Sequence, residues 1–389
     1  MISKTPDFSA RLQQLRAGMV KRGMDGIIVP HADMFLGEYV PPSGERLKWL
    51  TGFSGSAGVA VILVDKAVVM SDGRYTIQLK HEVDPALYET ADSTKIKVTD
   101  WIKANGAPGC VIGYDPALHT PAEIEVWEKS ALVFKPLEGN PVDEIWTDRP
   151  ELPQTPVSIF PVSYAGRGHE EKIKQISVVL KEKGVTHFLI SRPDSLAWLL
   201  NVRANDMAYI PVPLTYALVD DQAAVQWFIE SSRIPTQAQA TLGDHISFVM
   251  PDRMWATLEE IVRNGARVAI DSHHTSVLFS HVIARAGGKA IPMKDPCILP
   301  KACKTKEEQV AMRAAHVRDG VAMVRFLAAL DAEIREQKPL TEISVQEKLL
   351  QCRAQAPEYK GASFGTICGF GANGAIVHYH STKDTNICL

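Results

Sequence analysis

Two stretches of the chain share one pattern of hydrophobic and polar positions. Residues 11–29 combine an amphipathic helical pattern with a glycine, Gly23, and then a short apolar run that is typical of a buried strand. Residues 170–190 repeat this order around Gly184. The pattern predicts a helix, a tight turn and a strand in each stretch.

A second landmark extends the alignment of the two stretches. With Gly23 placed on Gly184, both copies later reach a Trp-Leu pair, which begins at Trp49 in the first copy and at Trp198 in the second. The first copy carries about twelve more residues between these landmarks, as expected where an insertion lies in a loop. We therefore expect two tandem αβ domains with mixed sheets that are related by duplication.

Proline-rich segments mark the expected domain boundaries. No helix or central strand persists through several prolines in a short span, so the first segment predicts a boundary near residue 155. A second segment, residues 291–309, precedes a helix start and places the beginning of a third unit near residue 304. The predicted domains are residues 1–155, 156–303 and 304–389. The prolines of the first segment are Pro150, Pro153, Pro156 and Pro161.

The third unit opens with a long predicted helix. Thr305 and Glu308 have the spacing of a capping box at its start. Apolar residues then recur at helical spacing as far as Ile334, and we expect the face that they form to be buried. The positions on that face are Val310, Ala314, Val317, Val321, Val324 and Leu327.

The last part of the sequence is predicted to form one more helix and a hairpin. Ser344, with Glu347 three residues later, is the expected cap of the helix. A short strand near residues 363–367 and a Gly-rich turn at residues 369–374 are expected to lead into a final strand. We interpret the turn as structural and not as a phosphate-binding loop, because no Lys-Ser/Thr pair follows it.

Two histidines, His378 and His380, lie on the predicted final strand. Alternation at period two puts both side chains on one face of that strand. A His-X-His pair lacks the third ligand of a metal site, so spacing alone leaves both an active-site role and a structural role open.

Composition and charge narrow the classes of partner. Hydrophobic residues make up 46% of the chain and charged residues 22%, which is typical of a globular protein. The formal net charge of −3 does not favour nucleic acid or an acidic membrane surface, so a small molecule or a peptide is the expected partner. The six cysteines are scattered, which indicates a reducing, cytoplasmic setting, and neither an export signal nor a membrane span is predicted.

Two other groups of residues have the composition of metal ligands. Asp271, His273 and His274 lie close together, but adjacent histidines on a strand point to opposite faces, so we interpret them as a solvated surface cluster. Cys297 and Cys303 have no second pair to complete four ligands, so free thiols are expected there.

Five segments, taken in order, resemble the cytosolic-type aminopeptidase P family. These are Xaa-Pro aminopeptidases of the creatinase/prolidase superfamily. The similarity extends over essentially the whole chain, and five ordered matches are more specific than any one of them. The segments are "GERLKWLTGFSGSAG" at 44–58, "SDGRYTIQ" at 71–78, "DEIWTDRPELP" at 143–153, "AWLLNVRANDMAYIPVPLTYAL" at 197–218 and "NGAIVHY" at 373–379.

The resemblance implies an α/β (α+β) subunit with three domains. Two tandem creatinase-like amino-terminal domains would be followed by a pita-bread domain, the third unit, that carries catalysis. The implied reaction is hydrolysis of the first peptide bond of peptides with proline at position two. Two divalent ions, typically manganese, would bridge the attacking water. The implied partners are proline-containing peptides and a second copy in a homodimer, with no nucleic acid and no membrane.

The sequence departs from the family pattern at the metal site. The resemblance implies five ligands, two Asp, one His and two Glu, that begin about twenty residues beyond the "NGAIVHY" segment, and Leu389 precedes all of them. We therefore expect an amino-terminal portion of a metal-dependent Xaa-Pro aminopeptidase that binds no catalytic metal by itself and is not active alone. The alternative is a catalytically dead module for dimerisation or peptide binding.

Two residues are carried over as site residues from the resemblance. His378 matches the family histidine that faces the substrate and helps to move protons or to hold the scissile carbonyl. Arg74, in "DGRY", matches a residue that the family places near the substrate. A surface arginine that pairs with Asp72 is the alternative for Arg74, and His380 has no counterpart.

Overall fold

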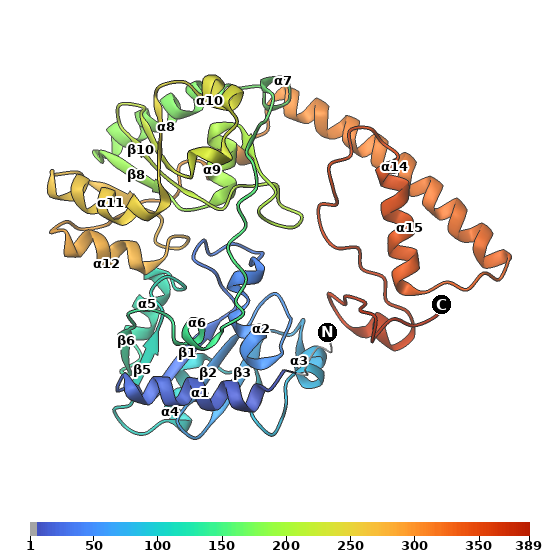
Figure 1. Cartoon of the computed structure of the whole chain (residues 1–389), viewed down its shortest axis with the longest axis horizontal. Helices are drawn as coiled ribbons and strands as arrows, with labels where there is room; N and C mark the ends of the chain where they lie inside the picture. The colour runs from blue at the N-terminus through green and yellow to red at the C-terminus, as the bar shows by residue number, and fades with distance from the viewer. Residues whose placement is uncertain (1–5) are drawn as a thin grey trace. The chain divides into compact units, whose positions relative to one another are not determined.

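The structure, a computed structural model, describes residues 6–389 and divides into two compact units (Figure 1). The first unit contains the chain up to Phe160 together with Arg167–Met207 and Val212–Cys303. The second contains Pro161–Gly166, Ala208–Pro211 and Lys304–Leu389. We describe each unit by itself.

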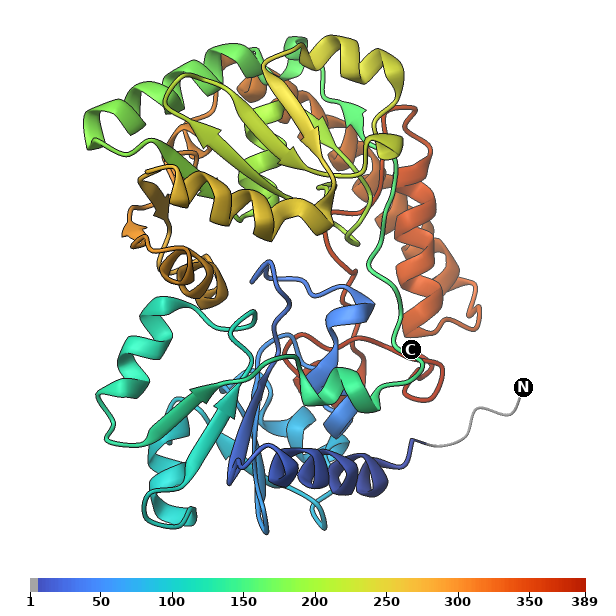
Figure 2. The same cartoon turned by 60° about the vertical axis from the view of Figure 1, so that its left-hand side comes forward.

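The first lobe of the first unit is a six-stranded mixed sheet with helices on both faces (Figure 2). Its strand order is β4-β3-β2-β1-β5-β6. Its elements are α1 (Phe8–Lys21), β1 (Gly26–Pro30), α2 (Arg46–Thr51), β2 (Val59–Leu63), β3 (Ala67–Ser71), α3 (Thr76–Glu82), β4 (Glu89–Asp92), α4 (Val98–Asn105), β5 (Val111–Tyr114), α5 (Pro121–Glu128), β6 (Val133–Pro136) and α6 (Pro141–Ile145).

The second lobe contains a second six-stranded sheet, of order β12-β11-β10-β8-β13-β14. Two short strands of this lobe, β7 and β9, pair antiparallel in a separate two-stranded sheet. The elements are β7 (Ser158–Ile159), α8 (His169–Lys183), β8 (His187–Ile190), α9 (Pro193–Leu200), β9 (Val202–Arg203), β10 (Tyr216–Asp220), β11 (Val225–Phe228), α10 (Thr236–Leu242), β12 (Ile246–Val249), α11 (Met254–Arg263), β13 (Val268–Ile270), α12 (Val277–Arg285), β14 (Ile291–Pro292) and α13 (Ile298–Ala302).

The two sheets have the same topology, which confirms the predicted duplication. In each, the first strand pairs antiparallel with the second and parallel with the fifth, which in turn pairs parallel with the sixth. The second and third strands are antiparallel, and the third and fourth are parallel. The same local signals therefore build the same mixed sheet twice.

A cation stacked on a tryptophan recurs at the same place in both lobes. Arg11 of α1 donates to the backbone oxygen of Trp49 and lies 4.2 Å from the centre of its ring. Lys172 of α8 donates to the backbone oxygen of Trp198 at 2.9 Å and lies 4.5 Å from its ring centre. The alignment of Gly23 with Gly184 places Arg11 on Lys172. Each pair fastens the first helix of its lobe to the second.

The central strand β1 shows why the sheet is covered on both faces. Ile27 and Val29 point into one apolar cluster, which also contains Leu12 and Leu15 of α1. Ile28 points to the opposite cluster, with Trp101 of α4. A strand buried on both sides reads as a continuous apolar run, which is the pattern seen in the sequence.

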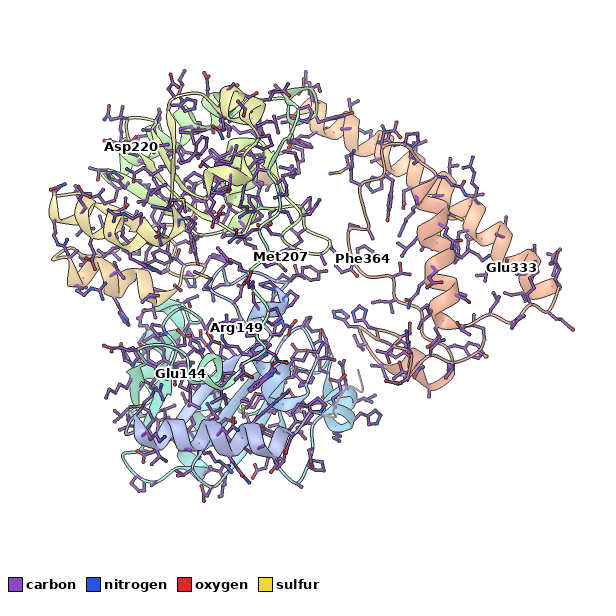
Figure 3. All side chains as sticks on the ribbon, in the orientation of Figure 1. Glu144, Arg149, Met207, Asp220, Glu333 and Phe364 are labelled. Carbon is purple, nitrogen blue, oxygen red and sulfur yellow. The ribbon has the colours of Figure 1, made fainter. Side chains whose placement is uncertain are left out.

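The linker between the lobes is extended chain without regular structure, from Trp146 to Val157. Arg149, labelled in Figure 3, donates to the backbone oxygen of Ser43 at 2.7 Å and so belongs to the first lobe. Thr155 donates from its hydroxyl to Asp206 at 2.7 Å and so belongs to the second lobe. The prolines between these anchors fit the predicted break in regular structure.

In the second unit, the long helix α14 (Lys306–Arg335) has the predicted start. Thr305 and Glu308 form both bonds of the capping box. The next helix, α15 (Glu342–Ala354), begins earlier than predicted, and its cap is Thr341 instead of Ser344. The Thr341 hydroxyl accepts from the Ser344 amide, and the Ser344 hydroxyl accepts from the Thr341 amide. A serine therefore replaces the acidic residue expected at the third position of the box.

The predicted buried face of α14 is wrong. Its apolar residues are exposed, from 47% at Val321 to 69% at Val317. The buried positions of the helix are Ala322 and Phe326, and Phe326 packs with Leu349 and other apolar residues of and near α15. Helical spacing marks an apolar face, but burial needs a partner surface, and within the second unit α15 lies against a different face of α14.

The predicted hairpin at residues 363–380 is also wrong. Within the described residues, this segment contains a short 3-10 helix at Gly371–Ala375 and no strand. An isolated bridge joins Thr341 to Cys388, both outside the segment. His378 has a φ of 57°, which is left-handed and interrupts any strand. A strand is stable only beside another strand, and the described part of this unit offers none, so the polar groups of the segment bond to one another.

Candidate functional site

A buried carboxylate, Glu342, organises the segment that carries the predicted site histidine. Glu342 is the first residue of α15 and has no exposed surface. It accepts hydrogen bonds from the Phe370 amide at 2.8 Å, from Asn373 Nδ2 at 3.1 Å and from the Tyr379 hydroxyl at 2.9 Å. Three donors from a loop otherwise without strands thus converge on one helix N-terminus.

The network keeps Glu342 charged. Burial opposes ionisation, but the hydrogen bonds from Phe370, Asn373 and Tyr379 outweigh it, so the pKa of this carboxyl lies below its ordinary value. The Tyr379 hydroxyl also accepts from Asn373 Nδ2 at 2.9 Å. A fully paired buried charge of this kind fixes the backbone on either side of Tyr379.

His378 and His380 flank the anchored Tyr379. Both are exposed, whereas Tyr379 is buried. Partial burial lowers the pKa of His380, and the nearby charge of His378 lowers it further, so the two rings lie within electrostatic reach of each other. They do not share a strand face as predicted, because the chain turns at His378.

Gly365 and Tyr209 border His380 on the same unit. A Cβ added at Gly365 would lie 3.2 Å from His380 Cε1 and 3.2 Å from the Tyr209 hydroxyl. A side chain at position 365 would therefore make a tight contact with both groups, and one of them would have to shift slightly. Sequence reasoning missed Tyr209, Glu342 and Tyr379, and no spacing signal joins them, since they are distant in the chain.

Arg74, the other predicted site residue, lies in the first unit and pairs with Asp72. Its Nε donates to Asp72 Oδ1 at 2.9 Å and its Nη2 to Oδ2 at 2.8 Å. The side chain is 43% exposed and lies 5.1 Å from the ring centre of Tyr75. This geometry is the surface ion pair that the sequence left as the alternative, and it also leaves the outer side of the guanidinium open to a ligand.

The residues with metal-ligand composition do not form a metal site. In the part of the chain that the structure describes, no three His, Cys, Asp or Glu side chains converge as metal ligands. Asp271 is buried instead of solvated, which corrects the surface interpretation, and it accepts from the amides of His273 and Asp295. Cys297 and Cys303 are free thiols, as predicted.

A cavity of about 360 Å³ lies between α14 and α15. Four of its charged side chains form ion pairs: Arg353 donates twice to Asp319, at 2.7 and 3.1 Å, and Arg318 lies 3.8 Å from Glu358. In each pair the opposite charges offset each other. No helix in the described part of the chain is both long and apolar enough for a transmembrane span.

Comparisons with known families match nearly the whole chain. Residues 11–145 and residues 148–308 each match a model of the creatinase/prolidase N-terminal domain. Residues 310–388 match the model of metallopeptidase family M24.

Relatives and a solved structure match the chain from end to end. A probable Xaa-Pro aminopeptidase P of Aspergillus niger is 34% identical over 394 residues, which are 98% of this chain and 64% of that protein. One of Ajellomyces dermatitidis is 32% identical over 97% of this chain and 64% of its own. An X-prolyl aminopeptidase of Caenorhabditis elegans, described as a cytosolic enzyme with a di-nuclear active site, superposes with a TM-score of 0.91 and 26% identity over 98% of this chain and 66% of its own. The chain thus spans just under two thirds of the proteins it matches.

Proposed function

The chain belongs to the aminopeptidase P family of the creatinase/prolidase superfamily, and from this membership we propose that it serves the removal of the first residue from peptides with proline at position two. The supporting observation is the ordered match of two creatinase-type domains and an M24 segment to relatives named for this activity. These matches do not favour a non-catalytic dimerisation or peptide-binding module.

We propose domain limits at residues 1–155, 156–303 and 304–389. The family-model limits near residues 145 and 310 support this division. On this division the two creatinase-like lobes form the amino-terminal domains, and the peptidase segment carries the Glu342 network and His378.

His378 is proposed to act on protons or on the scissile carbonyl of the peptide. Its imidazole is exposed, and the neighbouring Tyr379 anchors its backbone to Glu342. A general acid or base needs both access to the substrate and a fixed position. Arg74 is proposed as a substrate contact, with its orientation set by the two hydrogen bonds that it donates to Asp72.

Two divalent ions, with manganese as the proposed metal, would supply the activated water for hydrolysis. The family model is that of a metallopeptidase, and the Caenorhabditis elegans enzyme is described as di-nuclear. The residues described here do not fit such a pair, since no three potential ligands converge anywhere among them. We therefore assign to these residues binding, positioning and proton transfer, and no step at a metal.

A homodimer and a cytoplasmic location complete the proposal. The location is supported by the cytosolic description of the Caenorhabditis elegans enzyme and by the six cysteines, none of which is in a disulfide. Proline-containing peptides are the proposed substrates.

The test compares arginine release from Arg-Pro-Pro and from Arg-Ala-Pro, in the presence of Mn²⁺, by the natural polypeptide that contains residues 1–389. We expect release from the first peptide only. His378→Ala should lower kcat on the order of 100-fold, because a proton-transfer group acts mainly in the transition state. The matched control is His380→Ala, which removes the other exposed imidazole of the same turn and should change kcat little.

Four outcomes would contradict the proposal. Equal release from the two peptides would show that the enzyme has no specificity for proline at position two. Absence of release from both peptides would show that the proposed activity is missing. Equal losses for the two histidine variants, or a lower melting temperature with full activity for His378→Ala, would make His378 structural.

A further inference from the structure

The second halves of the two lobes repeat each other at a constant spacing. Thr120 occupies the N-cap position of α5, and Ser276, which lies 156 positions later, occupies the N-cap position of α12. The Leu137 amide bonds to the Tyr114 oxygen, and 156 positions later the Met293 amide bonds to the oxygen of Ile270. Equivalent residues of the lobes can thus be named without ambiguity.

The contact between the lobes uses these equivalent residues reciprocally. The Ala122 amide of α5 donates to the backbone oxygen of Ser272 at 3.1 Å. The Leu278 amide of α12 donates to the backbone oxygen of Pro116 at 3.0 Å. A shift of 156 positions converts each bond into the other. Figures 1 and 2 both show α5 and α12 side by side. Reciprocity of this kind is the signature of a two-fold interface between identical subunits.

One bond of the contact is one-sided, and the sequence explains why. The Val277 amide donates to the His119 oxygen at 2.7 Å. The equivalent donor in the first lobe would be the amide of residue 121, which is a proline and has no N–H. The Val277 side chain is 6% exposed and joins the apolar cluster of the first lobe. The two-fold relation therefore holds for the backbone positions, while one substitution has removed half of a bond pair.

A second contact between the lobes does not share this symmetry. The Tyr216 hydroxyl donates to the Met34 oxygen at 2.5 Å, and the Tyr216 ring stacks on Phe35 at 4.8 Å. Met34 and Phe35 lie in the extra residues of the first copy, which the second copy lacks. The insertion thus adds a further contact to an interface that already consists of equivalent residues of the two lobes.

We propose that the lobe contact is a homodimer interface retained within one chain. Residues 116–122 of the first lobe, here called the pairing surface, are self-complementary, and their partner is any second lobe of this fold. The first lobe freed from the second therefore pairs with another copy of itself through this surface. This proposal is independent of the peptidase function.

The first test cuts the linker of the full chain. A protease site inserted after Pro153 separates Arg149, held by the first lobe, from Thr155, held by the second. We expect the two fragments to co-elute after cleavage. Val277→Asp should separate them, because it buries an unpaired carboxylate in the contact, while an aspartate in the first turn of α12 suits the freed helix. Val178→Asp, at an exposed position of α8, is the matched control and should leave them together.

The second test asks whether the pairing surface binds itself. The first-lobe fragment released by Val277→Asp should sediment as a concentration-dependent dimer with unchanged far-ultraviolet circular dichroism. Pro121→Val restores the missing donor on both sides, so it should tighten the dimer by about tenfold or more. Ala122→Asp, in the first turn of α5, should abolish the dimer without harm to the helix.

Several results would overturn the proposal. Separation of the wild-type fragments would show that only the linker holds the lobes together, and co-elution with Val277→Asp would show that contacts outside the pairing surface do so. A folded monomeric fragment at all concentrations would deny self-complementarity. If the fragment unfolds, the uncut Val277→Asp chain provides the same test, because its pairing surface is exposed. Absence of self-association by this chain when it also carries Pro121→Val would contradict the proposal.

Discussion

Asp33 is a carboxyl group whose surroundings oppose its charge. It is 4% exposed, and in the described structure its Oδ2 atom has no hydrogen-bond partner. Burial raises its pKa from 3.8 to about 6, although the Phe35 amide and the charge of Arg46 act in the other direction. Because the folded pKa lies above the unfolded one, the folded state favours the neutral acid. Its contribution to stability is present below pH 4 and is lost as the pH rises through 6.

Asp33→Asn should therefore change the free energy of unfolding more favourably at pH 8 than at pH 4. The expected difference in the free energy of unfolding is on the order of 2 kcal/mol, from a pKa change of about two units. Urea unfolding at the two pH values measures it. Asp65→Asn, at an exposed position in the turn after β2, is the control and should show no such difference. An identical effect of Asp33→Asn on stability at both pH values would show that the pKa of the Asp33 carboxyl is not raised by folding.

At the scale of the element, the start of α15 depends on Thr341. Its hydroxyl accepts from the amide of the third helical residue, and Ser344 returns the bond. Thr341→Ala should lower the free energy of unfolding of the second unit by about 1 kcal/mol. Ser344→Ala should cost less, because it removes only the return bond. Thermal unfolding of both variants measures which one loses more stability. A larger loss of stability for Ser344→Ala would show that Ser344 is the more important cap, as the sequence predicted.

Local signals explain which elements the sequence could predict. The capping box of α14 and the helix-glycine-strand units are each written within a few neighbouring residues, so they were found. The hairpin at residues 363–380 and the burial of the α14 face were predicted wrongly, because a strand and a buried face each need a partner surface that local spacing does not specify. His378 was identified by resemblance, whereas its anchor, Glu342, was missed because a glutamate in a first turn usually serves only the helix dipole.

At the scale of the whole molecule, duplication explains more than the repeated sheets. Arg11 and Lys172 preserve a cation on tryptophan although the residue type changed, and the two lobes meet through equivalent backbone groups. The repeat was predictable because Gly23, Gly184 and the Trp-Leu pairs keep their order. The reciprocal contact was not, since nothing in the order of residues along a chain states which surfaces meet.

The last prediction concerns metal binding by residues 1–389 as a polypeptide. Two catalytic ions lie about 3.5–4 Å apart and repel each other, so several carboxylates and histidines must converge on them. No three such side chains do so within the described residues, and Asp271, which the sequence placed among histidines, uses its oxygens for the amides of His273 and Asp295. We therefore expect calorimetric titration with Mn²⁺ to show no saturable binding of two ions. Asp271→Asn is the control and should leave the titration unchanged. Saturation at two ions per chain would mean that these residues rearrange into a complete metal site, and the assignment of binding, positioning and proton transfer alone would then be wrong.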